Sequence, residues 1–296
     1  MIQIKELFGD KTFLNKEELF SFVVANEDAL KQSTRKSVSY SVNKSGSVGF
    51  YEAKNENVCG VEIEKSTMIK PKEGFFYPVI NSTMWMDSHL DVHLRGCYNK
   101  TVKDQNGKVQ LIDSHQKGFH NLIAPPSAVN MLVKEVDWKL LGKNIEGKSE
   151  CLVFEVDESK VIGKAQIEYA RNEKNIECSF AMIYVKSAYA FDSDKPEYAE
   201  YKERWDKFYP MIANKEMADK YGVFNCVYEL AIVGEGSLML GGMGKGSNSA
   251  TVGSITAYAE NKDTPEAVDD TSKESVPQEP SDNDTLAKLK SIIDNI

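Results

Sequence analysis

Hydrophobic and polar residues alternate along much of the chain between residues 37 and 233, and this two-residue period is typical of β-strands with one buried face. Strands are therefore predicted at 37–63, 74–86, 109–112, 129–141, 151–156, 177–184 and 224–233. The segment 161–171 fits either a strand or a short helix. Glycines follow the last predicted strand, so we expect residues 234–253 to form a mobile loop.

Two parts of the chain have helical spacing instead. Residues 16–35 carry apolar side chains on one helical face, with Asn15 as the expected N-cap, and we interpret residues 1–36 as a helical appendage. Residues 194–221 form a predicted helical insertion that begins at Pro196 and contains two helices.

The last part of the chain differs from the rest in charge. Residues 260–284 contain nine acidic residues and two lysines, which accounts for −7 of the net charge of −9. This composition predicts a disordered linker at 259–284. Residues 285–296 follow with an apolar stripe on a short helix, and we expect that helix to dock on a partner or on the body of the protein.

The composition excludes several classes of protein. A net charge of −9 argues against a nucleic-acid partner, and no apolar run reaches membrane-spanning length. The amino terminus lacks the order of a signal peptide, so we expect a cytoplasmic location. The five cysteines are widely spaced without a CxxC pair, which predicts reduced core residues.

His115 is the first candidate for chemistry, because it follows the predicted strand 109–112 and a strand end can hold an imidazole at a groove. Ser179, in the strand 177–184, is the candidate nucleophile. Cys178 is intrinsically the stronger nucleophile, but alternation places Cys178 and Ser179 on opposite faces, so only one of them can face His115. Glu229 is the candidate carboxylate that orients the imidazole.

The four histidines, at positions 89, 93, 115 and 120, also suggest a metal site. The HxxxH spacing of His89 and His93 binds zinc well on a helix, but the surrounding sequence is extended and lacks the glutamate of a hydrolytic motif. We expect no metal and no cofactor.

The order of five segments resembles that of a known protein family. Asp91-Val92, the turn Gly96-Cys97-Tyr98 and the strand before His115 come first; Cys178-Ser179-Phe180-Ala181 and the 228–233 strand with Glu229 follow. This order resembles the tailed-phage prohead (head maturation) protease family, whose strands carry a histidine, a Ser-Ile-Gly-Phe-like serine and a Glu-Val-Ser-hydrophobic acidic segment. The resemblance covers residues 58–233.

The resemblance implies a mostly antiparallel β-barrel wrapped by helices, similar to herpesvirus assemblin, over residues 37–258, and therefore an α+β protein. It also implies a serine endopeptidase with His115, Ser179 and Glu229 as catalytic residues. The implied substrates are the scaffold protein, the major capsid protein and the protease itself, inside the immature phage head in the host cytoplasm. Self-association into a homo-oligomer is left open.

Three departures from the family pattern keep an alternative open. Gln116 replaces an aspartate, Ala181 replaces a glycine, and residues 234–242 replace a Pro-Ala-Asn segment. They favour a catalytically inactive barrel that serves as a structural or scaffold-associated head protein. A metal-dependent or unrelated binding protein is the third class of function.

Overall fold

The computed structural model covers a chain of 296 residues. It describes residues 1–32, 35–40, 50–52, 68–69, 72–87, 89–141, 143–172, 176–240 and 254–255, which belong to one compact unit, Met1–Ala259. The predicted acidic linker and the short helix after it lie outside the described residues, as does most of the predicted strand region 37–63.

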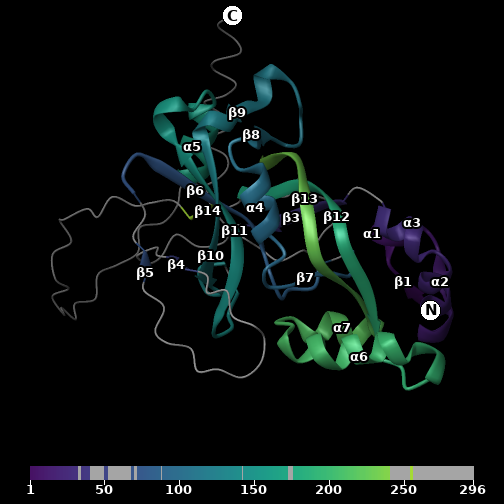
Figure 1. The fold of residues 1–296 in the computed structure, drawn as a ribbon. Coiled ribbons are helices and arrows are strands. Elements are labelled where there is room, and N and C mark those ends of the chain that lie inside the picture. Colours follow the sequence, from purple (N-terminus) through teal and green to yellow (C-terminus); the bar gives the residue numbers. More distant parts are fainter. Residues whose placement is uncertain are drawn as a thin grey trace, which may run out of the picture. The chain divides into compact units, whose positions relative to one another are not determined.

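Two long strands dominate the first sheet. β12 (Ile176–Phe191) and β13 (Val223–Leu240) pair antiparallel over most of their length. The sheet runs in the order β3-β12-β13-β8-β9, and β7 also pairs with β13. The flanking strands are β3 (Arg35–Tyr40), β7 (Asp91–His93), β8 (Gln110–Asp113) and β9 (Leu122–Ala124). β7 and β8 run parallel to β13, so the sheet is mixed (Figure 1).

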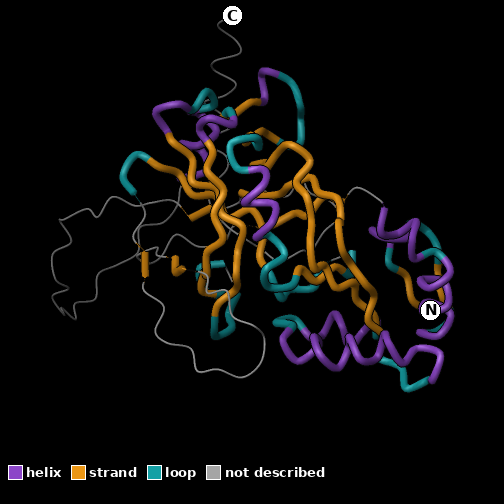
Figure 2. The backbone as a smooth tube through the Cα atoms, viewed as in Figure 1, coloured by secondary structure: helices purple, strands orange, loops and turns teal. Residues whose placement is uncertain are grey.

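The second sheet runs in the order β14-β6-β11-β10-β4-β5. Its strands are β4 (Phe50–Glu52), β5 (Met68–Ile69), β6 (Phe75–Ser82), β10 (Val129–Asp137), β11 (Lys148–Asp157) and β14 (Ser254–Ile255). β10 and β11 confirm the strands predicted at 129–141 and 151–156, and they pair antiparallel as a long hairpin. The orange strands of the two sheets occupy neighbouring layers in Figure 2.

The main core lies between the two sheets. Phe76 and Phe154 of the second sheet pack in one cluster with Phe180, Met182 and Leu238 of the first. Burying a side chain such as Phe154 stabilises the fold by about 1.5–3 kcal/mol. Because alternate side chains of a strand point to opposite faces, the even-numbered positions at the start of β12 enter this core, and the odd-numbered positions lie on the opposite face.

A second core joins the amino-terminal segment to the helical insertion. The segment contains β1 (Ile2–Gln3), α1 (Lys5–Phe8), β2 (Thr12–Phe13), α2 (Lys16–Ala25) and α3 (Glu27–Gln32). The insertion contains α6 (Ala199–Phe208) and α7 (Lys215–Tyr221). Phe20 of α2 stacks on Phe191 at the end of β12, with 4.6 Å between ring centroids. The insertion is therefore helical, as predicted.

The amino-terminal helix begins as the sequence predicts but ends earlier. The Asn15 side chain accepts a hydrogen bond from Glu18 N at 3.0 Å, which confirms the N-cap. The predicted single helix 16–35 is wrong, because Asn26 separates α2 from α3 and Arg35 already begins β3. The Asn26 side chain donates to Phe22 O at 2.8 Å, an alternative to continuing the helix.

Shorter elements complete the described chain. The segment 161–171 resolves as the helix α5 (Lys164–Asn172), and α4 (Asn99–Gln105) follows the Gly96 turn. The 3₁₀ turns are η1 (Phe119–Asn121), η2 (Pro126–Ala128), η3 (Glu158–Lys160), η4 (Pro196–Tyr198) and η5 (Tyr209–Met211). In the part of the chain that is described, no helix has the length and apolar character needed to cross a membrane.

These elements confirm the α+β class. The predicted barrel is not seen, because neither described six-stranded sheet closes on itself. The predicted loop 234–253 is wrong over its first residues, since β13 continues as a strand through Leu240. Two positions in this part of the strand require glycine. Gly234 has a φ of +79°, in the left-handed region, and a Cβ on Gly236 would lie 2.5 Å from the Phe154 ring.

Candidate active site

Three strands position the candidate site on the face of the first sheet opposite the main core. Ser179 of β12 is paired with Ser237 of β13, so their side chains share a face. Glu235 lies two residues before Ser237 and has the same orientation. The parallel pairing of β8 with β13 ends at Asp113 and Leu238, and His115 follows immediately.

The chain turns sharply after β8. Ser114 and His115 have φ values of +49° and +58°, in the left-handed region that non-glycine residues rarely adopt. Such a conformation costs on the order of 1–2 kcal/mol per residue. Ser114 N donates to Leu238 O at 2.8 Å, and His115 N donates to the Ser237 hydroxyl at 2.7 Å. These bonds to β13 hold the turn, which directs the imidazole back over the sheet.

The imidazole of His115 bridges a hydroxyl and a carboxylate. Its Nε2 lies 2.8 Å from Ser179 Oγ, and its Nδ1 lies 2.7 Å from Glu235 Oε1. An ionised carboxylate can only accept hydrogen bonds, so Nδ1 carries the proton and Nε2 is left to accept from the Ser179 hydroxyl. This is the arrangement in which a histidine acts as general base toward a serine.

The site is enclosed. Ser179 is 0% exposed, and the side chains of His115 and Glu235 are 9% and 1% exposed. Within the described chain, Glu235 Oε2 has no hydrogen-bond partner, and Oε1 bonds to His115, so the imidazole is the main polar partner of this carboxylate. Burial strengthens that interaction, because the local dielectric is low. It also means that a substrate can contact Ser179 only after the residues that cover it have moved.

The structure brings His115 and Ser179 together, as the sequence analysis expected, but it places Glu229 elsewhere. Glu229 pairs with Lys186, seven positions along β12 from Ser179, which is roughly 23 Å at about 3.3 Å per residue. Its Oε1 lies 3.5 Å from Lys100 Nζ. The expectation that Glu229 orients the imidazole is therefore wrong, and Glu235 occupies that position.

The register of β12 against β13 explains the difference, because Ser179 pairs with Ser237, which lies two residues after Glu235 and eight residues after Glu229. A bulge follows in the same ladder. Phe180 pairs with Gly236 and Met182 pairs with Ile232, so the single residue Ala181 opposes three residues of β13 that end with Glu235. The left-handed Gly234 lies within this bulge. Sequence alternation alone does not show how a bulge shifts one strand against its partner, and the glycines around Glu235 favoured a loop.

One sequence signal could have identified Glu235. The segment Glu235-Gly236-Ser237-Leu238 matches the Glu-Val-Ser-hydrophobic pattern at three of four positions, whereas Glu229 is followed by Leu230 and Ala231. The other candidate nucleophile, Cys178, lies in the main core with 0% exposure. Cys178 points away from His115, in agreement with the prediction that Cys178 and Ser179 lie on opposite faces of the strand.

The remaining histidines do not join the site. His93 is buried in β7, with Nδ1 3.3 Å from Asn81 Nδ2 and Nε2 3.4 Å from Met182 Sδ. His93 lies on the strand β7, so the HxxxH spacing of His89 and His93 does not fall on a helix. His120 lies in the η1 turn. Among the described residues, no group of three or more potential ligands is arranged to hold a metal ion.

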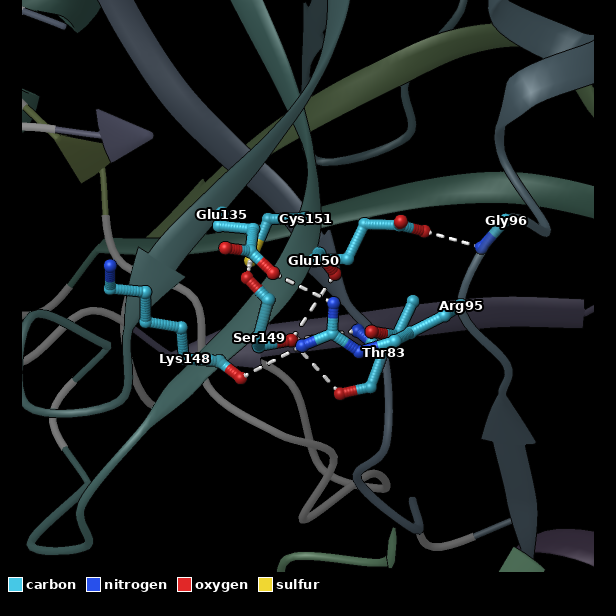
Figure 3. A network of polar contacts seen from close by, with 8 residues as sticks. All are labelled: Thr83, Arg95, Gly96, Glu135, Lys148, Ser149, Glu150 and Cys151. Atoms are coloured by element: carbon cyan, nitrogen blue, oxygen red, sulfur yellow. Dashed lines mark hydrogen bonds and ion pairs between the residues drawn. The ribbon is translucent and has the colours of Figure 1, made fainter. Parts of the chain in front are cut away.

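A second charged cluster joins the 95–98 turn to the other sheet (Figure 3). Glu135 of β10 and Glu150 of β11 are cross-strand partners, and Arg95 Nη1 lies 2.7 Å from Glu135 Oε1. Gly96 N donates to Glu150 Oε1 at 2.6 Å. Burial raises the pKa of Glu150, while its hydrogen bond from Gly96 and the nearby Arg95 oppose that shift. The network also contains a hydroxyl and a thiol, and both donate to main-chain oxygens: Ser149 Oγ to Thr83 O, and Cys151 Sγ to Ser149 O.

Comparisons with known proteins add no identification: no family model matches the sequence, and neither a curated protein nor a solved structure does. The assignment of a function therefore depends on the geometry around His115 and on the pattern resemblance described above.

Proposed function

We propose that the protein is a serine hydrolase of the endopeptidase type, with Ser179 as nucleophile, His115 as general base and acid, and Glu235 as the residue that orients and stabilises the imidazole. One observation carries the proposal. The imidazole of His115 lies at hydrogen-bond distance from Ser179 Oγ on one side and from Glu235 Oε1 on the other, at 2.8 and 2.7 Å.

The chemistry follows from these contacts. Ser179 Oγ attacks a peptide carbonyl carbon while its proton passes to His115 Nε2. The C–N bond then breaks, and the same proton is donated to the leaving amine. Water repeats the sequence on the acyl-enzyme and releases the acid. Glu235 accepts from Nδ1 throughout, which favours the positive charge that the ring carries in each transition state.

The burial of Ser179 indicates that this structure is a resting state. A hydroxyl with 0% exposed surface cannot contact a peptide carbonyl, so reaction requires a local opening above β12. If only open molecules can react, the observed reaction rate is the rate of the open form multiplied by the fraction of molecules that are open. We therefore expect slow reaction in the isolated protein and faster reaction where binding of a substrate stabilises the open form.

The substrate class comes from the resemblance to prohead proteases. That resemblance supports scaffold protein, major capsid protein and the chain itself as substrates inside an immature phage head. The segment Glu235-Gly236-Ser237-Leu238 strengthens it, because the acidic residue of that motif is the one that contacts His115. The role in the phage head is supported by this resemblance, whereas the serine hydrolase chemistry is supported by the contacts of His115.

A fluorophosphonate, which reacts only with activated serines, tests the chemistry. In the reaction Oγ bonds to phosphorus, fluoride leaves and His115 takes the proton. We expect mass spectrometry of the intact chain to show one adduct on Ser179, lost in Ser179→Ala and His115→Ala and kept in Cys178→Ala. Terminal sequencing of the incubated full chain tests self-cleavage in parallel. An adduct that persists in Ser179→Ala would refute the assignment of the nucleophile.

The burial of Ser179 also favours a second candidate, a catalytically inactive relative with a structural or scaffold-associated role. In that case the triad geometry persists without reaction. Absence of both adduct and self-cleavage after long incubation, in a folded protein and in the presence of its capsid and scaffold partners, would support this candidate over the endopeptidase.

A further inference from the structure

We propose that Ser237 is a positioning residue that fixes His115 between Ser179 and Glu235. This inference rests on the proposed function. The Ser237 hydroxyl bonds to main-chain atoms, and its effect is exerted through the main chain of His115. The hydroxyl accepts from His115 N at 2.7 Å and lies 3.3 Å from Ile112 O, to which it donates. It thus joins the end of β8 to the turn that follows.

The turn needs such a support. Regular pairing between β8 and β13 stops at Asp113 and Leu238. Ser114 N still donates to the main-chain oxygen of Leu238, but the next amide, His115 N, donates to the Ser237 side chain. The left-handed conformations of Ser114 and His115 would relax if the turn were free. The Ser237 hydroxyl occupies the place of a ladder acceptor for His115 N–H and keeps the histidine in its strained conformation.

The position of Ser237 couples the turn to the other site residues. Ser237 is the cross-strand partner of Ser179 and lies two residues after Glu235 on the same face of β13. One strand therefore carries the carboxylate, the support for the imidazole and the neighbour of the nucleophile. Ser237 is 0% exposed, so water cannot replace its hydroxyl without a local opening.

Ser149 provides a matched control for the loss of a buried hydroxyl. Its hydroxyl accepts from Thr83 N at 3.0 Å and donates to Thr83 O at 2.9 Å, and it is 1% exposed. It therefore makes the same kind of side-chain bonds to the main chain as Ser237, but it lies in β11, in the second sheet. Its removal should affect stability and leave the imidazole in place.

The experiment compares the wild-type chain with Ser237→Ala, Ser237→Thr and Ser149→Ala, under conditions where circular dichroism shows all four to be folded. The first readout is the rate of fluorophosphonate labelling of Ser179. We expect Ser237→Ala to react about 100-fold more slowly, since a displacement near 1 Å has an effect of this order. Ser149→Ala should react at the wild-type rate, and Ser237→Thr should recover most of the rate.

The second readout does not depend on activity. The proton on His115 Nδ1, hydrogen-bonded to Glu235, should give a downfield NMR signal in the wild type and in Ser149→Ala. The signal should disappear or move in Ser237→Ala. If the wild type is not labelled, the proposed function fails, and this signal alone decides the role of Ser237. A signal that is unchanged in Ser237→Ala, or labelling at the wild-type rate, overturns the inference.

Discussion

Glu235 and Glu150 are both almost completely buried, at 1% and 3% exposed, yet they meet different partners. Glu235 contacts an imidazole whose other nitrogen contacts a serine hydroxyl. Glu150 accepts from the main chain of Gly96 and lies across the ladder from Glu135, with Arg95 nearby. A buried carboxylate by itself does not indicate catalysis, and the groups opposite to it decide which chemistry it can support.

The same contrast holds for two buried serines. Ser149 bonds to Thr83 within the main-chain framework of the second sheet, and Thr83 N also donates to Glu150 O. Ser237 holds a turn with two left-handed residues, one of which carries the imidazole. Left-handed non-glycine residues are expensive to maintain, so their presence beside the candidate nucleophile points to a geometrical requirement there.

Glu235→Gln should have the largest effect, and it should distinguish the His115 site from the cluster around Glu150. The amide can donate to Nδ1 and so favour the tautomer whose Nε2 carries a proton, which cannot accept from Ser179. We expect fluorophosphonate labelling to slow on the order of 10³- to 10⁴-fold. Glu150→Gln and Glu229→Gln are the controls, and both should react within about twofold of the wild type. Equal losses in Glu229→Gln and Glu235→Gln would contradict the placement of the triad.

A smaller effect, on stability, is expected from Gly236→Ala. The added Cβ would lie 2.5 and 2.8 Å from two ring atoms of Phe154 in the main core. We expect the free energy of unfolding in urea to fall by about 1–3 kcal/mol, as for other overpacked sites. Part of the loss should return in the double variant with Phe154→Leu.

Gly118→Ala is the matched control for this substitution, because the position is exposed and a Cβ there would lie 3.4 Å from the Asn121 side chain. It should leave the unfolding midpoint nearly unchanged. A Gly236→Ala variant as stable as the wild type would show that the packing between the two sheets adjusts more easily than the contacts indicate.

The smallest expected effect is the pH dependence associated with Glu150. Burial raises its pKa above the ordinary value of 4.5, so the folded protein binds this proton more tightly than the unfolded chain. The contribution of Glu150 to stability is therefore present at low pH and decreases as the pH rises from 4.5 through the raised value. Glu150→Gln lacks this titration while keeping an acceptor for Gly96 N.

Urea unfolding at several pH values between 4 and 8 measures the difference in the free energy of unfolding between Glu150→Gln and the wild type. We expect the variant to become more stable relative to the wild type as the pH increases. Equal denaturant slopes for the two proteins serve as the check that they unfold between comparable states. A difference that shifts in favour of the wild type with increasing pH would mean that Arg95 outweighs burial at this site.

Several features could be predicted from the sequence because they depend on local spacing. The alternation of β10, β11, β12 and β13, the Asn15 cap and the helical insertion are all determined by neighbours within a few residues. The opposite orientations of Cys178 and Ser179 follow from the same two-residue period. His115 and Ser179 could be proposed as partners because a strand end and a strand position limit where side chains can point.

The third member of the site depended on the tertiary structure. Whether Glu229 or Glu235 meets the imidazole is decided by the register that pairs Ser179 with Ser237, and by a left-handed turn held by Ser237. Both features arise from pairing between segments more than fifty residues apart in the sequence, and local spacing does not determine such pairing. The complete burial of Ser179 and the lack of barrel closure among the described strands are likewise properties of the packed chain, because they depend on which distant segments pack together.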